Sequence, residues 1–152
     1  MATVVKPSTL TVEIRERISL NDIDRGSYVT TNISPIGEID NRIMSISAAT
    51  NGTDIFNVGT VGSGTHNKST FKYCRISNLD TDNFIVIQMT DSSAKHWELI
   101  LEAGKTLMFG DVTKVNNQAD IDDYDDADAS IVKVVGLADT AAVDIEVYIA
   151  ST

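Results

Sequence analysis

The chain has 152 residues, of which 42% are hydrophobic and 22% are charged, and its formal net charge at pH 7 is −10. A chain of this length forms one domain that buries roughly 68–70% of its unfolded surface, so disulfide or metal staples are not required. Acidic chains repel phosphates, which disfavours nucleic-acid binding, and the apolar runs fall far short of the ~20 residues that a membrane helix needs.

The apolar residues are mostly branched at Cβ: 17 Ile and 14 Val stand against 7 Leu, and 16 Thr add to them. Branching at Cβ restricts χ1 and favours strands over helices. Short strands separated by turn residues at intervals of about 8–12 residues are typical of sandwiches and barrels. We therefore predict an all-β fold, an antiparallel, jelly-roll-like β-sandwich of about 8–10 short strands.

In chain order, the first predicted strand has Leu10, Val12 and Ile14 alternating with polar residues, the period of a half-buried strand. The clearest strand is the last, where every second residue from Val143 to Ile149 is Val or Ile. Weaker strands between them are predicted at residues 27–33, 41–48, 54–58, 70–77, 84–89, 96–101, 105–109 and 130–135. A short helix is predicted, at most, near residues 117–127.

Clusters of turn-forming residues separate these strands, and the first lies at residues 34–37. We predict an N-terminal arm at residues 1–11 and a single β-sandwich domain at residues 12–152. Trp97, Leu99 and Leu101 alternate like the last strand, so both sets are predicted to be buried as core.

Two polar segments are long enough to be functional loops, at residues 59–68 and 116–129. Gly59 and Gly64 have the spacing of a phosphate-binding loop, but Thr65 and His66 stand where that motif needs Lys and Ser or Thr. We interpret the first segment as a surface hairpin loop.

The second segment is acidic, and a calcium site there is the alternative to a solvated run of charge. An EF-hand loop starting at its first aspartate would place Asp125 where the turn demands Gly, and Ile131 where the bidentate Glu belongs. We favour the solvated run, and keep the six aspartates as a weaker calcium candidate: Asp120, Asp122, Asp123, Asp125, Asp126 and Asp128.

Soft metal ligands and nucleophiles are few. Cys74, His66 and His96 have no metal-ligand spacing, and no nucleophile–base arrangement is visible. We therefore expect no cofactor, no catalytic residue and no enzymatic activity.

One stretch resembles a known class of protein. Residues 71–109 contain Ile76-Ser77-Asn78-Leu79-Asp80, then Asn83-Phe84-Ile85, and then the turn Leu101-Glu102-Ala103-Gly104-Lys105. This pattern, together with the closing segment at residues 137–150, is similar to small β-sandwich virion proteins of tailed bacteriophages.

The resemblance implies a non-enzymatic structural protein of the virion, such as a capsid decoration (cement or knob) protein on the capsid exterior. Its partners would be the major capsid protein or other virion proteins, without nucleic acid or membrane, and self-association stays open. Such a protein assembles in the host cytoplasm, which agrees with the absence of a basic, then apolar, secretion signal at the N-terminus. The alternatives are a tail or head–tail connector component, and a host-surface or carbohydrate-binding sandwich that uses Tyr124 or Tyr148.

The predicted capsid contact is the N-terminal arm, which is nearly uncharged and can order against a neighbouring subunit. The residues assigned to it are Thr3, Val4, Val5, Lys6 and Pro7. Because burying like charges in an interface is costly, the acidic segment is expected to face solvent.

Overall fold

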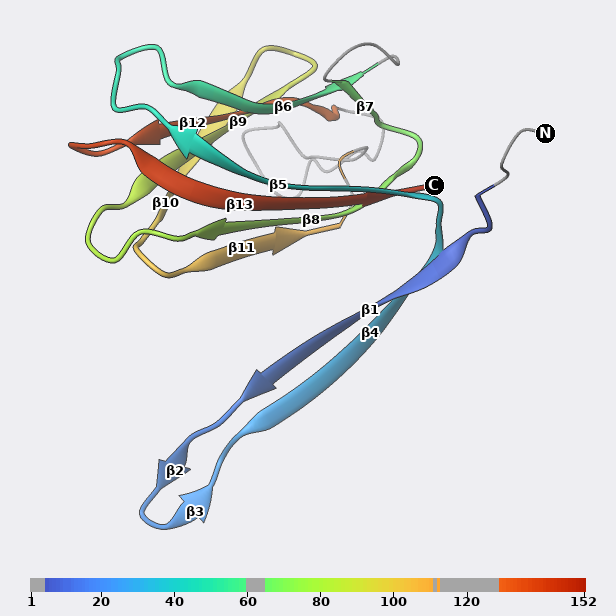
Figure 1. Ribbon diagram of the computed structural model, residues 1–152, viewed down its shortest axis with the longest axis vertical. Helices are drawn as coiled ribbons and strands as arrows, with labels where there is room; N and C mark the ends of the chain where they lie inside the picture. The colour runs from blue at the N-terminus through green and yellow to red at the C-terminus, as the bar shows by residue number, and fades with distance from the viewer. Residues whose placement is uncertain (1–4, 60–64, 111, 113–128) are drawn as a thin grey trace, which may run out of the picture.

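The computed structural model describes residues 5–59, 65–110, 112 and 129–152. Within these ranges the fold is all-β, as predicted, with thirteen strands and no helix. Nine of the strands form a β-sandwich, and the first four form a hairpin that leaves it (Figure 1). The predicted helix near residues 117–127 lies outside the described ranges.

The sandwich has two sheets. The five-stranded sheet has the order β10 (His96–Leu101), β9 (Ile85–Asp91), β12 (Ile131–Ala138), β6 (Thr53–Gly59) and β7 (Thr65–Asn67). The four-stranded sheet has the order β11 (Thr106–Phe109), β8 (Phe71–Asn78), β13 (Val143–Ser151) and β5 (Glu38–Ile46).

The chain path through the sandwich is that of a rolled hairpin. Strand β5 pairs with β13, β6 with β12, β8 with β11 and β9 with β10, so the first strands pair with the last in reverse order. All four pairings are antiparallel, and β9 also pairs with β12 and β8 with β13 inside the two sheets. Two four-stranded sheets connected in this way make a jelly roll.

Strand β7 is an addition to the jelly roll. It pairs with β6 in parallel, with Val58 opposite His66. The interpretation of residues 59–68 as a hairpin loop is therefore wrong, because the strands of a hairpin run antiparallel.

The inner faces of the two sheets form one core, as the alternation in the sequence predicts. Val143, Ile145, Val147 and Ile149 are between 0% and 1% exposed, and Leu101 is 5% exposed. Leu99 packs at the edge of the core and is only partly buried. The predicted burial of Trp97 is wrong, since its exposed fraction is 37%. Strand β10 is an edge strand of its sheet, and among the described residues no further strand pairs with it beside this ring.

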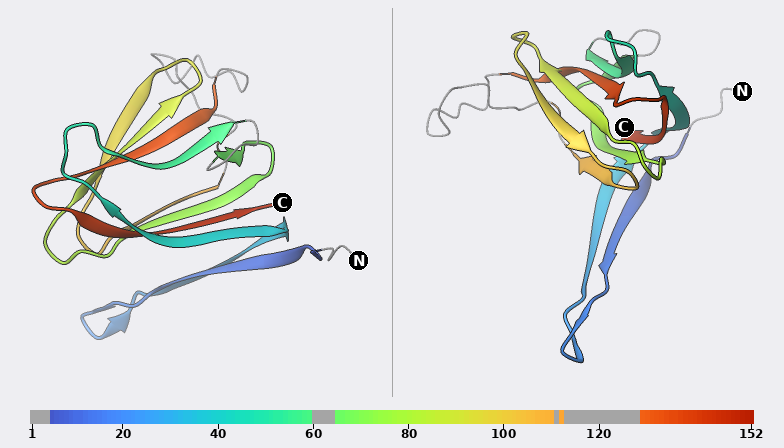
Figure 2. Two further views of the ribbon diagram at one scale, coloured as in Figure 1. Left: turned by 45° about the horizontal axis from the view of Figure 1, so that its top comes forward. Right: turned by 90° about the vertical axis from the view of Figure 1, so that its left-hand side faces the viewer.

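The first four strands form the hairpin arm, which we define as Ser8–Ile36. Strand β1 (Ser8–Glu16) pairs with β4 (Ser27–Ile36), and β2 (Ser19–Leu20) pairs with β3 (Ile23–Asp24) at the tip. Figures 1 and 2 show the arm running away from the sandwich, so that its tip stands clear of both sheets.

The arm turns tightly at its tip and leaves the sandwich abruptly at its root. Asn21 and Asp22 both have positive φ, 52° and 62°, as the two central residues of a type I′ hairpin turn require. At the root only Gly37 separates β4 from β5. The predicted turn at residues 34–37 is thus a strand that continues to Ile36, and the division between arm and sandwich falls at Gly37.

Candidate functional site

The hairpin arm has one apolar and one polar face, set by the register of its two strands. Leu10 lies opposite Ile33, and Ile14 lies opposite Val29, with Val12 between them on the same side. Opposed residues of an antiparallel pair point to the same face of the ribbon, and alternate pairs to opposite faces. The apolar side chains therefore make a stripe along one face of the inner part of the arm, and the next pair on that face, Glu16 and Ser27, ends it.

The root of this stripe packs on the sandwich. Leu10, Val12 and Ile33 contact a small cluster on the outer face of the four-stranded sheet. From the sheet, Tyr73, Ala150 and the half-buried Tyr148 take part, and Ile36 joins them from the end of β4. This second, smaller core anchors the arm and sets the direction in which it leaves the body.

Beyond the root the stripe has no cover within the described residues. Ile14 is 40% exposed and Val29 is 51% exposed. At the tip, Ile18, Leu20 and Ile23 are all more than half exposed. Exposed apolar side chains thus occur both in the middle of the arm and at its tip, and large exposed apolar patches are typical of protein–protein contact sites.

The opposite face of the arm is polar and internally bonded. The Thr11 hydroxyl donates to the Asn32 side-chain oxygen at 2.9 Å, and the Tyr28 hydroxyl donates to the Glu13 carboxylate at 2.7 Å. Arg15 lies opposite Tyr28 on the same face. These hydrogen bonds join the two strands on the solvent-exposed polar face, so the apolar side chains are confined to the other face.

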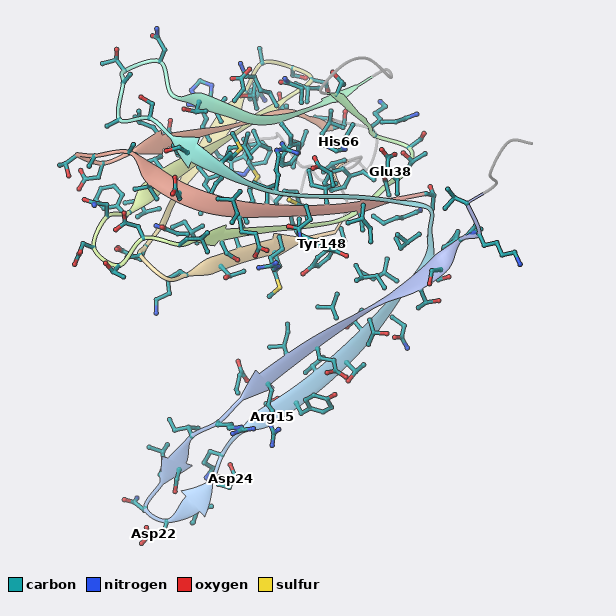
Figure 3. All side chains as sticks on the ribbon, in the orientation of Figure 1. Arg15, Asp22, Asp24, Glu38, His66 and Tyr148 are labelled. Carbon is teal, nitrogen blue, oxygen red and sulfur yellow. The ribbon has the colours of Figure 1, made fainter. Side chains whose placement is uncertain are left out.

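The arm also differs from the rest of the chain in charge. Residues 8–36 contain four acidic residues and three arginines, a net charge of −1, while residues 37–152 contain eighteen acidic and eight basic residues, a net charge of −10. The three arginines, Arg15, Arg17 and Arg25, all lie in the outer half of the arm. Figure 3 shows Arg15 there, well separated from Tyr148 on the sandwich.

A groove of about 350 Å³ lies between the arm and the outer face of the four-stranded sheet. Residues 10–13 line one wall, and Tyr73, Arg75, Met108 and Tyr148 line the other. The Arg75 guanidinium donates to the Glu146 carboxylate at 2.7 Å and lies 5.9 Å from the centre of the Tyr148 ring. Burial raises the pKa of the Tyr73 hydroxyl, so this wall carries a neutral phenol at neutral pH.

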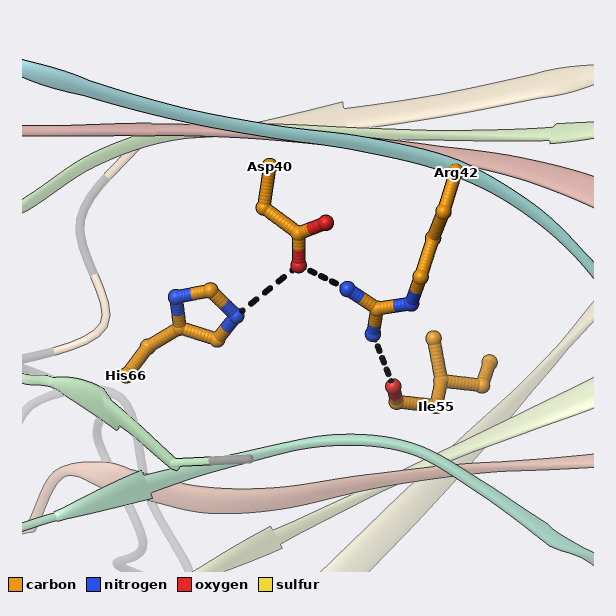
Figure 4. Close-up of polar contacts among 4 residues, drawn as sticks. All are labelled: Asp40, Arg42, Ile55 and His66. Carbon is orange, nitrogen blue, oxygen red and sulfur yellow. Dashed lines mark hydrogen bonds and ion pairs between the residues drawn. The ribbon is translucent and has the colours of Figure 1, made fainter. Parts of the chain in front are cut away.

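A cluster of polar side chains connects the two sheets where the edge strand β5 faces β6 and β7 (Figure 4). Arg42 forms an ion pair with Asp40, and its other terminal nitrogen donates to the backbone carbonyl of Ile55 at 2.6 Å. The Asp40 carboxylate also lies 3.4 Å from His66 Nε2. Since β5 supplies Asp40 and Arg42 while β6 and β7 supply the other two residues, the cluster bridges the sheets.

The electrostatics of this cluster favour a neutral imidazole. Burial and the nearby positive charge of Arg42 lower the pKa of His66, and Glu38 opposes them more weakly. Asp40 shares its negative charge with the Arg42 guanidinium, so it does little to stabilise an imidazolium. The His66 ring lies edge-on to Phe56 and Phe71, at 5.9 Å and 6.3 Å between centroids. These contacts hold β5 against β6 and β7, and none of the side chains in them is a nucleophile.

The structure describes only some of the residues assigned to the capsid contact. Val5, Lys6 and Pro7 are exposed and lead directly into β1. Thr3 and Val4, and the six aspartates of the calcium candidate, lie outside the described residues. Tyr124 does too, while Tyr148 lies in the groove under the arm.

Cys74 and His96 occupy opposite environments. The Cys74 side chain is fully buried in the core, and burial raises the pKa of its thiol, which keeps it protonated and unreactive. His96 is exposed at the start of β10. Nothing in the described ranges gathers three or more His, Cys, Asp or Glu side chains into a group that could hold a metal ion.

Comparison with known proteins adds no relative: no protein-family model, curated protein or solved structure matches the chain. Across the described ranges there is also no helix with the length and hydropathy needed to span a bilayer. The hairpin arm and the sheet face beside it are therefore the features on which a function can be argued.

Proposed function

We propose that the chain is a non-enzymatic structural protein of a tailed-phage virion, and specifically a capsid decoration protein that binds the capsid exterior. The observation that carries this proposal is the apolar stripe of the hairpin arm. A two-stranded hairpin is at best marginally stable in water, and this one presents isoleucine, leucine and valine along its outer half. Such an arm is expected in a subunit whose neighbours in an assembly cover its exposed apolar side chains.

The body of the protein suits the same role. The jelly roll has one continuous core and offers a stiff, compact unit on which an attachment element can be carried. The net charge of −10 on residues 37–152 limits sticking between decorated particles and to nucleic acid. The first segment that resembles phage virion proteins, residues 71–109, folds as β8 to β11. The second, residues 137–150, comprises the end of β12, the turn after it and most of β13.

We assign attachment to the particle to the N-terminal segment. Val5, Lys6 and Pro7 are exposed and extend from the start of β1, beside the root of the arm. A segment with a single charge, that of Lys6, can order on a neighbouring subunit through backbone hydrogen bonds and small apolar contacts.

The test has two parts. A mass-spectrometric inventory of purified virions should contain the chain, and the purified chain should bind particles that lack it, saturating at a fixed ratio to the major capsid protein. If the chain were found in isolated tails and not in isolated heads, it would be assigned to the tail or the connector. Absence from virions, together with binding to a glycan array, would favour the host-surface alternative and overturn the proposal.

A further inference from the structure

Strand β7 is an addition to the jelly roll that makes little backbone contact with it. The strand has three residues, Thr65–Asn67, and lies at the edge of the five-stranded sheet, where it pairs in parallel with β6. On its other side β6 keeps its own antiparallel pairing with β12. The four strand pairs that define the jelly roll do not include β7, so its release breaks none of them.

His66 is the side chain that connects β7 to both sheets (Figure 4). It lies opposite Val58, which is 4% exposed, so the two side chains point inward. There His66 Nε2 lies 3.4 Å from the carboxylate of Asp40 on β5, the edge strand of the other sheet. The ring also lies edge-on to Phe56 of β6 and Phe71 of β8. One side chain therefore holds β7 against three other strands.

The His66 ring covers part of an aromatic cluster in the core. Phe56, Phe71 and Phe109 stack with their ring centroids between 5.8 and 6.5 Å apart. The first two of these residues are 2% and 4% exposed, and the His66 side chain is itself only 17% exposed. Because the imidazole contacts both of these phenyl rings, its departure with β7 uncovers apolar surface at this edge of the sandwich.

Within the described residues, the charged groups that face the His66 ring come from β5. They are Glu38, Asp40 and Arg42. Strands β6 and β8 present phenyl rings to the imidazole. The charged side chain of β6, Asp54, pairs with β12, and Lys72 of β8 alternates with buried residues and so points away from the core.

This surrounding makes a proton on His66 costly while β7 is in place. Burial and the positive charge of Arg42 lower the pKa of His66, and the negative charge of Glu38 opposes them more weakly. Asp40 gives little help because it already forms an ion pair with Arg42. Once β7 has left, the imidazole is in water and titrates near its ordinary value of 6.5. Proton uptake therefore favours the released state, increasingly so as the pH falls through this range.

We propose that β7 is a pH-sensitive latch: protonation of His66 releases Thr65–Asn67 from β5 and β6 and uncovers Phe56 and Phe71, while the jelly roll stays folded. The latch is a conformational device of the isolated chain. It goes beyond the proposed function and does not depend on it.

Hydrogen exchange of the folded chain at about pH 7.5 and about pH 5 tests the latch, because carboxylates with ordinary pKa values near 4 stay ionised throughout. Each rate is corrected for the intrinsic pH dependence of exchange. The protected amides of Thr65–Asn67 should open at least about tenfold more often than those of β12 and β13 at both pH values, which identifies a local opening. Opening of β7 should rise at least about threefold at the lower pH.

His66→Phe keeps an aromatic ring against Phe56 and Phe71 but cannot titrate, so opening of β7 should be the same at both pH values. The matched control is His96→Phe, which changes the other histidine of the chain, exposed at the start of β10 in the same sheet. This control should keep the pH dependence of the wild type. If His66→Phe does not fold, His66→Gln takes its place, because its amide stays neutral and can still donate to Asp40.

Three results would overturn the latch. The amides of β7 would have the same protection as those of β12 and β13, which would mean that β7 opens only when the whole domain unfolds. Opening of β7 would be equal at the two pH values in the wild type. Its pH dependence would persist without His66, or would disappear in the His96 control. Binding to particles enters none of these readings, so failure of the latch leaves the virion proposal standing.

Discussion

Ile145 lies at the middle of β13 and is completely buried between the two sheets. Its neighbours along the strand, Val143 and Val147, are equally buried, so a cavity at this position cannot be filled by solvent. Changing Ile145 to Ala should lower the free energy of unfolding by about 2–5 kcal/mol, from lost burial and the cavity left behind. Urea unfolding followed by fluorescence measures the difference.

Ile43 provides the control for this prediction. It lies on the neighbouring strand β5 but on the outer face, where it is 68% exposed, so Ile43→Ala should change the unfolding free energy by no more than about 0.5 kcal/mol. Equal losses for the two variants would mean that the inner and outer faces of this sheet have been assigned the wrong way round.

His66 should make stability depend on pH. Its folded-state pKa lies below its ordinary value of 6.5, so the unfolded chain binds more protons in the interval between the two values. The unfolding free energy should therefore be highest above about pH 6.5 and should fall as the pH drops through that value toward the folded-state pKa. Below both values the loss attributable to this residue is complete.

His66→Phe is the variant that tests this, because a phenyl ring keeps the contacts with Phe56 and Phe71 but cannot titrate. Urea unfolding between about pH 7 and about pH 5 should show a smaller loss of stability for the variant than for the wild type. A wild-type slope equal to that of the variant would show that His66 is protonated equally in both states.

Among the elements, the outer end of the arm, residues 17–26, should be removable without damage to the sandwich. Glu16 and Ser27 are directly opposed, so an Asn-Gly turn can join them in place of residues 17–26. The core between the two sheets contains no residue from that segment. The shortened chain should melt within a few degrees of the wild type at low protein concentration, as measured by circular dichroism; a loss of cooperative melting would show that the tip supports the body.

The strands themselves were largely predictable, because each depends on local alternation. The prediction at residues 96–101 coincides with β10, and that at residues 105–109 lies within one residue of β11. Strands β2, β3 and β7 were missed, since two or three residues are too few to show a period.

The candidate site was harder to predict than the fold. Alternation of Leu10, Val12 and Ile14 indicates that one face of a strand is apolar, but does not say whether the same chain covers that face. Nor does it distinguish an internal strand from a projecting ribbon. The one local signal was the Asn21-Asp22 pair between Leu20 and Ile23, which suits a type I′ turn.

At the scale of the whole molecule, the sandwich and the hairpin arm differ in how completely they are packed. The rolled hairpin from β5 to β13 closes its own core, whereas the arm completes only its root on that body. The body thus has a closed core of its own, whereas the outer part of the arm keeps exposed apolar side chains that a neighbouring subunit could cover. This division between a closed body and an incompletely packed arm is the feature on which the virion proposal rests.

Binding to the particle should depend on the N-terminal segment and not on the acidic one. Deleting residues 2–7 spares β1 but removes the exposed Val5, Lys6 and Pro7, so affinity for particles that lack the chain should fall by about tenfold or more. Changing Asp120, Asp122, Asp123, Asp125, Asp126 and Asp128 to Asn should leave it nearly unchanged, because we expect the interface to exclude this run of like charge, whose desolvation would be costly. Co-sedimentation with particles measures both variants at two salt concentrations. Binding that disappears in the Asn variant, and that falls steeply with salt or with a chelator, would instead place a basic capsid patch or a calcium ion at the acidic segment.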